Sequence, residues 1–199
     1  MSARIGVERA RTAYHEAGHL LIGSLFGFLC SSVSIRPDDA RGSLGRVVAL
    51  GGPACRSARA NGGWQMMSGV SRGTVERWLC VLFAGFAAEV RFAPESRDAA
   101  REGASGDDEQ AEAYLERAGM ATDSTRHLLR ARTAALIEQH WAGIEFVARA
   151  LLRHEEFDSG EARRICEIAR GAVTEADLQR YRALPARSQA NAAGYLIAR

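Results

Sequence analysis

The chain has 199 residues and a formal net charge of +2, and its 47% hydrophobic and 25% charged residues are typical of a folded domain rather than a disordered one. All 26 basic residues are arginines, so the chain lacks the lysine of a phosphate-binding P-loop and does not hydrolyse ATP by that route. The arginines are scattered, and the small net charge gives no indication of nucleic-acid binding.

The cysteines indicate a reducing compartment. Cys30, Cys55, Cys80 and Cys166 lie far apart and form no CxxC pair, so they resemble neither a zinc knuckle nor a disulfide framework. The longest apolar run, residues 20–30, is shorter than the roughly 18 residues that span a bilayer. The N-terminus lacks the apolar core of a signal peptide. We therefore expect a cytoplasmic protein without a membrane span.

The first half of the chain predicts two helices and a strand pair. The first helix covers about residues 7–28, and its apolar second half predicts a central, buried helix. Residues 31–50 predict two strands joined by a polar turn, with "GRVVAL" as the second strand. Residues 51–70 are rich in glycine and predict a surface loop. A second helix follows over about residues 73–92 and stops at Pro94.

The second half predicts further helices. Ser105 and Asp108 have the spacing of a capping box, and Gly119 suits a C-terminal cap. One long helix is predicted over about residues 124–154, and two shorter ones over 159–170 and 175–184. The last of these has Thr174 and Asp177 in capping relation. The prediction is a single, mainly α domain with a small β-sheet over residues 1–185, followed by a weakly ordered tail over 186–199.

The stretch "HEAGH", residues 15–19, carries the clearest chemistry. Residues four apart lie on one face of a helix, so His15 and His19 can direct their imidazoles at one metal ion. Glu16 is rotated by one residue and reaches the open side of that ion instead of ligating it. A catalytic zinc keeps three protein ligands and a water whose pKa it lowers to about 7. Glu16 would take the proton of that water and pass it to the leaving amine.

Chance rarely produces this motif. With 5 histidines and 16 glutamates in 199 residues, HExxH is expected about 0.01 times per chain. A polar helical turn without function is the alternative, and these odds favour zinc. The other histidines, His127, His140 and His154, fall along the predicted long helix and are too far apart to share a metal.

Spacing alone leaves the third ligand open. The extended HExxHxxGxxH pattern fails because no histidine occurs between His19 and His127. The remaining candidates are downstream acids. They are Glu89, Asp107, Asp108 and Glu109. Acids that open a helix more often serve as caps or interact with the helix dipole.

The residues resemble a known family segment by segment. "AYHEAGHLL" resembles the zinc helix of the FtsH-type ATP-dependent proteases, and "SVSIRP" with "GSLGRVVAL" resembles the strand pair that follows it there. "LCVLFAGFAAEV", "GASGDDEQAEAYL" and "ALLRHEEFDSGEARRI" are similar to later segments of the same peptidase domain, in the same order. The resemblance covers about residues 10–168. It implies an FtsH-like metallopeptidase fold, mainly helical, with the HEAGH helix central.

The resemblance also implies roles for individual residues. It makes His15, His19 and Asp107 the zinc ligands, Glu16 the general base, and Glu89 a residue that orients a ligand histidine. It implies endoproteolysis of unfolded polypeptides, with the substrate adding as an extended strand to the edge at "GRVVAL". Without the resemblance, that segment would be taken as an ordinary hairpin strand.

Two departures from the family support an alternative. The sequence contains neither the AAA ATPase module nor the membrane helices, so a separate ATPase partner would have to deliver folded substrates. Phe86 stands where the family has an arginine. The alternative is a catalytically weak or inactive zinc-containing binding module derived from a peptidase. The intact Glu16 favours the enzyme. The physiological substrate, the cleavage preference and the oligomeric state, including a homo-oligomer such as the family's hexameric rings, stay open.

Overall fold

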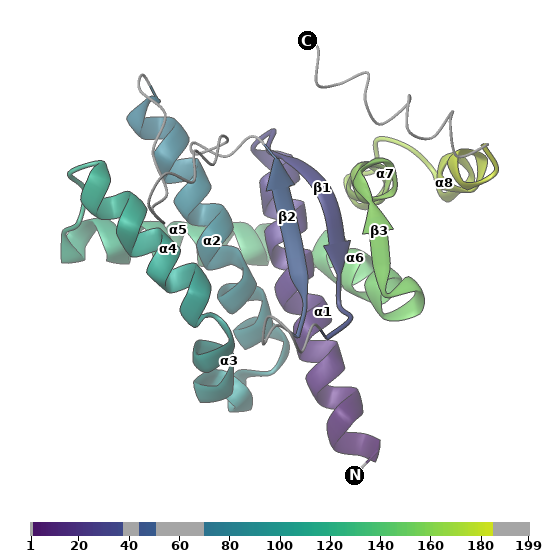
Figure 1. The fold of residues 1–199 in the computed structure, drawn as a ribbon, viewed down its shortest axis with the longest axis horizontal. Coiled ribbons are helices and arrows are strands. Elements are labelled where there is room, and N and C mark those ends of the chain that lie inside the picture. The colour runs from purple at the N-terminus through teal and green to yellow at the C-terminus, as the bar shows by residue number, and fades with distance from the viewer. Residues whose placement is uncertain (1, 38–43, 51–69, 185–199) are drawn as a thin grey trace, which may run out of the picture.

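The computed structural model describes residues 2–37, 44–50 and 70–184, and Figure 1 shows a small sheet that lies against a central helix, with further helices on either side. Within these ranges the chain is mainly helical with one three-stranded sheet, as the sequence predicts. The helices are α1 (Ser2–Leu25), α2 (Arg72–Phe92), α3 (Arg97–Gly103), α4 (Ser105–Arg117), α5 (Asp123–Gln139), α6 (Trp141–His154), α7 (Ser159–Ala169) and α8 (Glu175–Arg182). A 3₁₀ turn (Pro94–Ser96) precedes α3, and the strands are β1 (Leu29–Ser34), β2 (Arg46–Leu50) and β3 (Glu156–Asp158). None of the helices in the described ranges has the length and apolar character needed to cross a membrane.

Helix α1 occupies the centre of the molecule, as the apolar second half of the predicted helix indicates. It contacts α2, α6 and α7 as well as β1 and β2. Ala17, Leu21 and Ile22 are buried in the core. The helix ends at Leu25 rather than near Phe28, because Gly27 has a φ of +78° and turns the chain into β1.

Small residues let α1 and α2 approach closely. A Cβ atom at Gly18 of α1 would lie 2.5 Å from the carbonyl oxygen of Ala84 and 2.8 Å from the Cβ of Ala88, both on α2. Only glycine therefore fits at position 18 without displacing α2. This close crossing is what brings the HEAGH turn of α1 onto the middle of α2.

The sheet is antiparallel, with strand order β2-β1-β3. The predicted strand pair is confirmed: Val33 of β1 lies opposite Val47 of β2, and a bulge interrupts the pairing between Cys30 and Ser32. The third strand was not predicted. It has three residues, too few for a period-two pattern, and it places buried Phe157 opposite Val33.

The prediction of one helix over residues 124–154 is wrong. The chain breaks at His140, where φ is −110° and ψ is 19°, so that α5 and α6 are separate helices. Helix α5 packs on α2, whereas α6 packs on α1 and α7. A straight helix could not reach both surfaces. At Gly143, three residues past His140, an added Cβ would lie 3.0 Å from Leu21 of α1.

The predicted capping box at Ser105 and Asp108 is also wrong. Ala104 is the N-cap of α4, no side chain caps it, and the chain enters α4 directly from α3, which was not predicted as a separate helix. Asp108 instead accepts a hydrogen bond from Arg130 at 2.8 Å. Because Ala104 occupies the N-cap position, Ser105 lies inside the first turn of α4 and is not placed to cap it.

The other predicted caps hold. Thr174 and Asp177 form a reciprocal capping box at α8, and Gly119 follows α4 with a φ of +65°. Cys30, Cys80 and Cys166 are free thiols. Cys55, most of the predicted loop (51–69) and the predicted tail (186–199) lie outside the described residues.

Candidate metal centre

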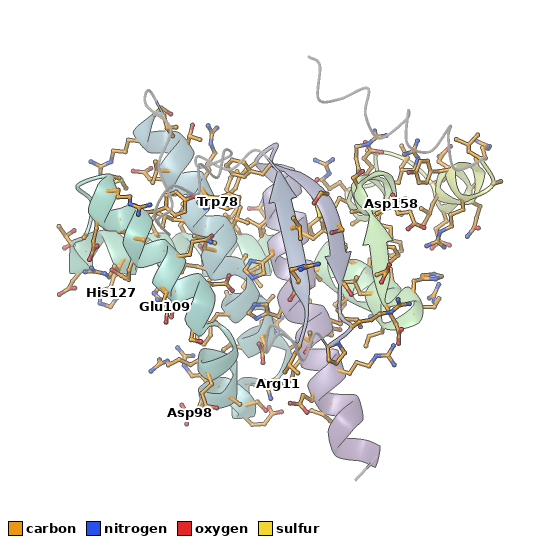
Figure 2. The ribbon with its side chains drawn as sticks, in the orientation of Figure 1. Arg11, Trp78, Asp98, Glu109, His127 and Asp158 are labelled. Carbon is orange, nitrogen blue, oxygen red and sulfur yellow. The ribbon has the colours of Figure 1, made fainter. Side chains whose placement is uncertain are left out.

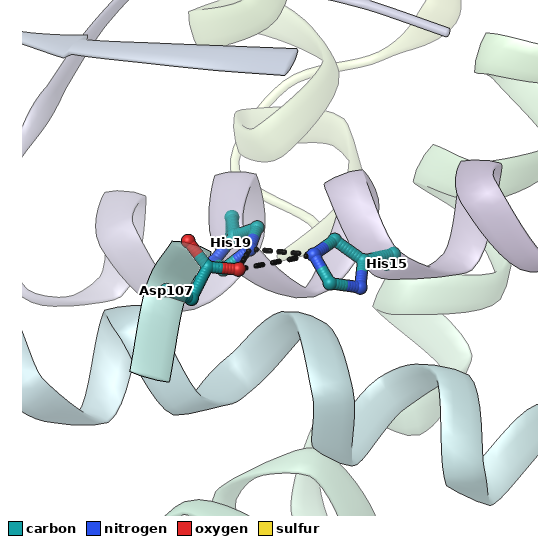
Figure 3. Close-up of side chains that lie close together, drawn as sticks. All are labelled: His15, His19 and Asp107. Carbon is teal, nitrogen blue, oxygen red and sulfur yellow. Dashed lines mark hydrogen bonds and ion pairs between the residues drawn. The ribbon is translucent and has the colours of Figure 1, made fainter. Parts of the chain in front are cut away.

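Three predicted ligands meet at one point in the structure. His15 and His19 project from the same face of α1, and Asp107 reaches them from the first turn of α4 (Figure 3). The Asp107 Oδ2 atom lies 3.2 Å from His15 Nε2 and 3.1 Å from His19 Nε2, and the two Nε2 atoms are 3.0 Å apart. Within the described ranges, this is the one cluster of three histidine, cysteine or acidic side chains that could hold a metal ion.

The hydrogen bonds of the two Nδ1 atoms determine that the Nε2 atoms of His15 and His19 face Asp107. His19 Nδ1 donates to the carbonyl oxygen of Val81 at 2.7 Å, and His15 Nδ1 donates to Glu89 Oε2 at 3.1 Å. A neutral imidazole that carries its proton on Nδ1 has its lone pair on Nε2. Two nitrogen lone pairs and a carboxylate oxygen therefore converge, and they repel one another unless a cation lies among them.

The pKa values of His15 and Asp107 also show that this cluster favours a positive charge. Burial opposes a charge on His15, but hydrogen bonds to Asp107 and Glu89 raise the pKa of His15 from 6.5 to about 10. Burial would raise the pKa of Asp107, yet His19 and His15 outweigh it and hold that pKa well below 3.8. A proton fulfils this role without a metal, and a metal ion bound by the same atoms would displace that proton.

The three ligand atoms fit a tetrahedral ion. Metal–ligand bonds of about 2.0–2.1 Å at tetrahedral angles separate neighbouring ligand atoms by about 3.3 Å. The observed separations of 3.0, 3.1 and 3.2 Å are only slightly shorter. Two imidazole nitrogens and one carboxylate oxygen are a donor set that zinc accepts. A tetrahedral ion held by these three residues would keep a fourth position for a water or a substrate.

Glu16 lies beside the ligands in the wall of this cavity. Its side chain is buried, with 6% of the residue exposed, and the backbone of Val47 in β2 hydrogen-bonds to its carboxylate. Burial raises the pKa of Glu16 above 4.5, although His15 and His19 act in the opposite direction. Gly45 packs directly on it, since an added Cβ there would lie 2.7 Å from Glu16 Oε1. The start of β2 thus covers this carboxylate.

Glu89 of α2 takes the place that the resemblance implies for it, next to a ligand histidine. Its second oxygen is held by Arg11 of α1, whose Nε lies 2.8 Å from Glu89 Oε1. Burial would raise the pKa of Glu89, but hydrogen bonds from His15 and Arg11 lower it. Arg11 was not predicted as a site residue from the sequence. Its position four residues before His15, on the same helical face, was the available signal.

Gly85 was also missed. A Cβ atom at this position on α2 would lie 2.5 Å from His15 Nε2 and closer still to His19 Nε2. The two ligand imidazoles therefore lie directly against the α2 backbone, and position 85 has no room for a side chain. The available signal was the glycine of "AGF" inside the helix predicted over residues 73–92, because a helix interior rarely carries a glycine without a packing reason.

A cavity of about 820 Å³ opens onto the three ligands and is lined by α1, α2, β2 and the α3–α4 junction. Trp78, Val81 and Leu82 of α2 line it, and so do Glu8 and Arg11 of α1. Figure 2 labels two of these lining residues, Trp78 on α2 and Arg11 on α1. The lining thus combines apolar side chains of α2 and charged side chains of α1 with the three candidate ligands.

No family model matches this chain, and no curated protein sequence matches it either. The FtsH resemblance therefore stays a prediction that depends on the five segments and their order. Phe86, the departure from the family pattern, lies on α2 with the Arg97 guanidinium 5.6 Å from its ring centroid.

Proposed function

We propose that this protein is a zinc metalloendopeptidase that hydrolyses peptide bonds of unfolded polypeptides. The observation that carries the proposal is the convergence of His15 Nε2, His19 Nε2 and Asp107 Oδ2 within 3.2 Å of one another, in the wall of a cavity that Glu16 also lines. A zinc ion bound there would polarise a peptide carbonyl as a Lewis acid and acidify a water in the open position.

The chain's own residues supply the proton transfers. Glu16 would accept a proton from the attacking water and return it to the leaving amine. Glu16 is buried, and a buried carboxylate is costly to keep charged unless a cation lies nearby. Its place beside the three ligands is therefore consistent with a base that acts next to a metal ion. A zinc ion held by the three ligands would lower the pKa of Glu16 and favour the ionised form that a base requires.

The binding of an extended substrate follows from the place of β2. Among the described strands, β2 pairs with β1 on one side, and Gly45 and Val47 line the cavity near Glu16. A peptide added along β2 would pass in front of the ligands by strand addition. Only an unfolded segment can pair in this way, so peptides and unfolded chains are the proposed substrates.

The alternative is a zinc-containing binding module without activity. Closed structural zinc sites have four protein ligands, whereas three protein ligands with an adjoining cavity are typical of catalytic sites. The buried Glu16 has no evident purpose in a structural site. Both points favour the peptidase. An FtsH-like fold, a separate ATPase partner and assembly into a homo-oligomer belong to the same proposal and depend on the resemblance. A cytoplasmic location belongs to it too and depends on the cysteine pattern.

Degradation of an unfolded protein such as casein tests this function. The zinc-loaded protein should cleave casein without ATP, lose that activity in a chelator and regain it when zinc is added back. A tightly folded protein of similar size serves as the control and should stay intact. Zinc bound at one ion per chain without any cleavage of casein or of short peptides would contradict the peptidase and favour the binding module.

A further inference from the structure

Arg11 and Glu89 form a buried ion pair immediately behind the metal ligands. Arg11 Nε and Nη2 both approach Glu89 Oε1, at 2.8 and 2.5 Å, and the exposed fractions of the two side chains are 17% and 6%. The other carboxylate oxygen, Oε2, lies 3.1 Å from His15 Nδ1. The guanidinium, the carboxylate and the imidazole are therefore linked in one chain of contacts that ends at the ligand atom His15 Nε2.

The two ligand histidines are held in different ways. His19 Nδ1 donates to the carbonyl oxygen of Val81, a backbone atom inside α2 whose position does not depend on any rotamer. His15 Nδ1 donates to a side-chain carboxylate, which can rotate about its terminal bond. The orientation of the His15 ring therefore depends on the orientation of the Glu89 carboxylate.

We propose that Arg11 is a positioning residue of the metal centre. By binding Oε1 of Glu89 it keeps Oε2 directed at His15 Nδ1, which holds the Nε2 lone pair toward the bound ion. This inference depends on the metal-binding part of the proposed function and is independent of peptide hydrolysis. The hydrogen bond from His15 to a carboxylate also makes the imidazole a stronger ligand, so the metal should dissociate faster when the carboxylate turns away.

Helix packing alone does not account for the pair. The close contact of α1 with α2 is already made by small residues at Gly18, Ala84 and Ala88. An ion pair at this depth costs desolvation that apolar side chains of similar size would avoid. Two nitrogens of Arg11 contact Oε1 of Glu89, the oxygen that His15 does not contact. Because each oxygen has its own partner, the carboxylate group of Glu89 is fixed in rotation.

A double-mutant cycle on zinc affinity tests the proposal. The variants are Arg11→Met, Glu89→Gln and the double variant, with zinc affinity measured by competition against a chromogenic chelator. Loss of an outer partner of a ligand weakens metal binding by about 10- to 100-fold. We expect Glu89→Gln to fall in this range and Arg11→Met to weaken binding by about 10-fold. In the Glu89→Gln background, Arg11→Met should add less than about 2-fold, because its partner is already altered.

Two further variants separate positioning from general damage. Arg11→Lys keeps a cation near Glu89 Oε1 and should recover part of the lost affinity. Arg9→Met removes another ion pair of α1, the 2.7 Å contact with Glu155 at the surface, and should leave zinc affinity unchanged. Circular dichroism and thermal unfolding establish that each variant is folded. The visible spectrum of the cobalt-substituted protein should change in Arg11→Met and not in Arg9→Met.

Unchanged zinc affinity in Arg11→Met overturns the proposal. So does a loss of affinity from Arg11→Met that is equally large in the wild-type and Glu89→Gln backgrounds. Should Arg11→Met raise the KM for peptides while zinc affinity stays constant, Arg11 is a substrate contact and the proposal is also overturned. If zinc binds as predicted but no peptide is cleaved, the proposed function fails and the cycle still decides the role of Arg11. A wild-type protein that binds no zinc contradicts both.

Discussion

Gly85 of α2 lies directly against His15 of α1, so close that a methyl group at position 85 would come within 2.5 Å of the ligand atom His15 Nε2. The same methyl group would also meet His19 Nε2. The two candidate ligand histidines are therefore held in place by backbone contact as well as by hydrogen bonds. This contact makes position 85 a sensitive probe of the centre, although it carries no functional group.

Gly85→Ala should weaken zinc binding by at least about 100-fold, because both imidazoles must rotate away from the added methyl group. Gly73→Ala is the matched control. It changes a glycine in the same helix, where an added Cβ meets nothing within 4 Å, and it should leave zinc affinity unchanged. Chelator competition measures both variants. Wild-type affinity in Gly85→Ala would show that the ligands do not lie against α2 as described.

Gly18→Ala tests the helix crossing rather than the ligands. The added methyl group would lie 2.5 Å from the Ala84 carbonyl oxygen, so α1 and α2 must separate. Such overpacking reduces the free energy of unfolding by about 1–3 kcal/mol. Urea denaturation measures this loss. Gly6→Ala, in the same helix but with open space around its Cβ, should not lower stability, and an equal loss in both variants would refute the close crossing.

Asp107→Asn removes the charged ligand and should reduce zinc affinity by at least about 100-fold, because a neutral amide is a much poorer zinc ligand than a carboxylate. The adjacent Asp108→Asn is the control. Asp108 is bound to Arg130 at 2.8 Å, and both side chains are more than a third exposed, so its loss should cost at most about 1 kcal/mol of stability and little zinc affinity. Equal losses of zinc in the two variants would argue against Asp107 as the third ligand.

Zinc should stabilise the protein more strongly as the pH rises. In the metal-free protein the pKa of His15 is raised from 6.5 to about 10. Its protonation therefore stabilises the fold fully below 6.5, and this contribution is lost as the pH rises toward 10. Zinc must displace the proton, which is easier at higher pH. The increase in melting temperature caused by zinc should be larger at about pH 8 than at about pH 6. An equal increase at both would contradict proton competition at this centre.

Local patterns were sufficient to predict the helices that carry the chemistry. The spacing of His15 and His19 places both on one helical face, which is a geometric necessity of the α-helix. The position of Asp107 could not be predicted by spacing, because it lies 88 residues after His19 and reaches the ligands through the packing of α4 on α2. The resemblance suggested Asp107, and the structure places it beside both histidines.

Other features depend on contacts that a sequence pattern does not record. The buried residues Leu129, Thr133 and Ile137 of α5 and Ile144, Ala148 and Leu151 of α6 continue one helical period, so the break at His140 leaves no trace in the pattern. In the sequence, Arg11 cannot be distinguished from any charged residue at a helix surface, because its partner Glu89 lies on another helix. Gly85 matters because of what packs on it, and that is a property of two helices together.

The most direct test of the central claim is a paired measurement on the wild-type protein and Glu16→Gln: zinc content and the rate of casein cleavage. Glu16 contributes no ligand atom, and glutamine keeps its size. We expect about one zinc per chain in both proteins, with cleavage reduced by at least about 100-fold in Glu16→Gln, the scale of a lost general base. If Glu16→Gln cleaves as fast as the wild type while both hold zinc, Glu16 is not the base and the proposed mechanism is wrong.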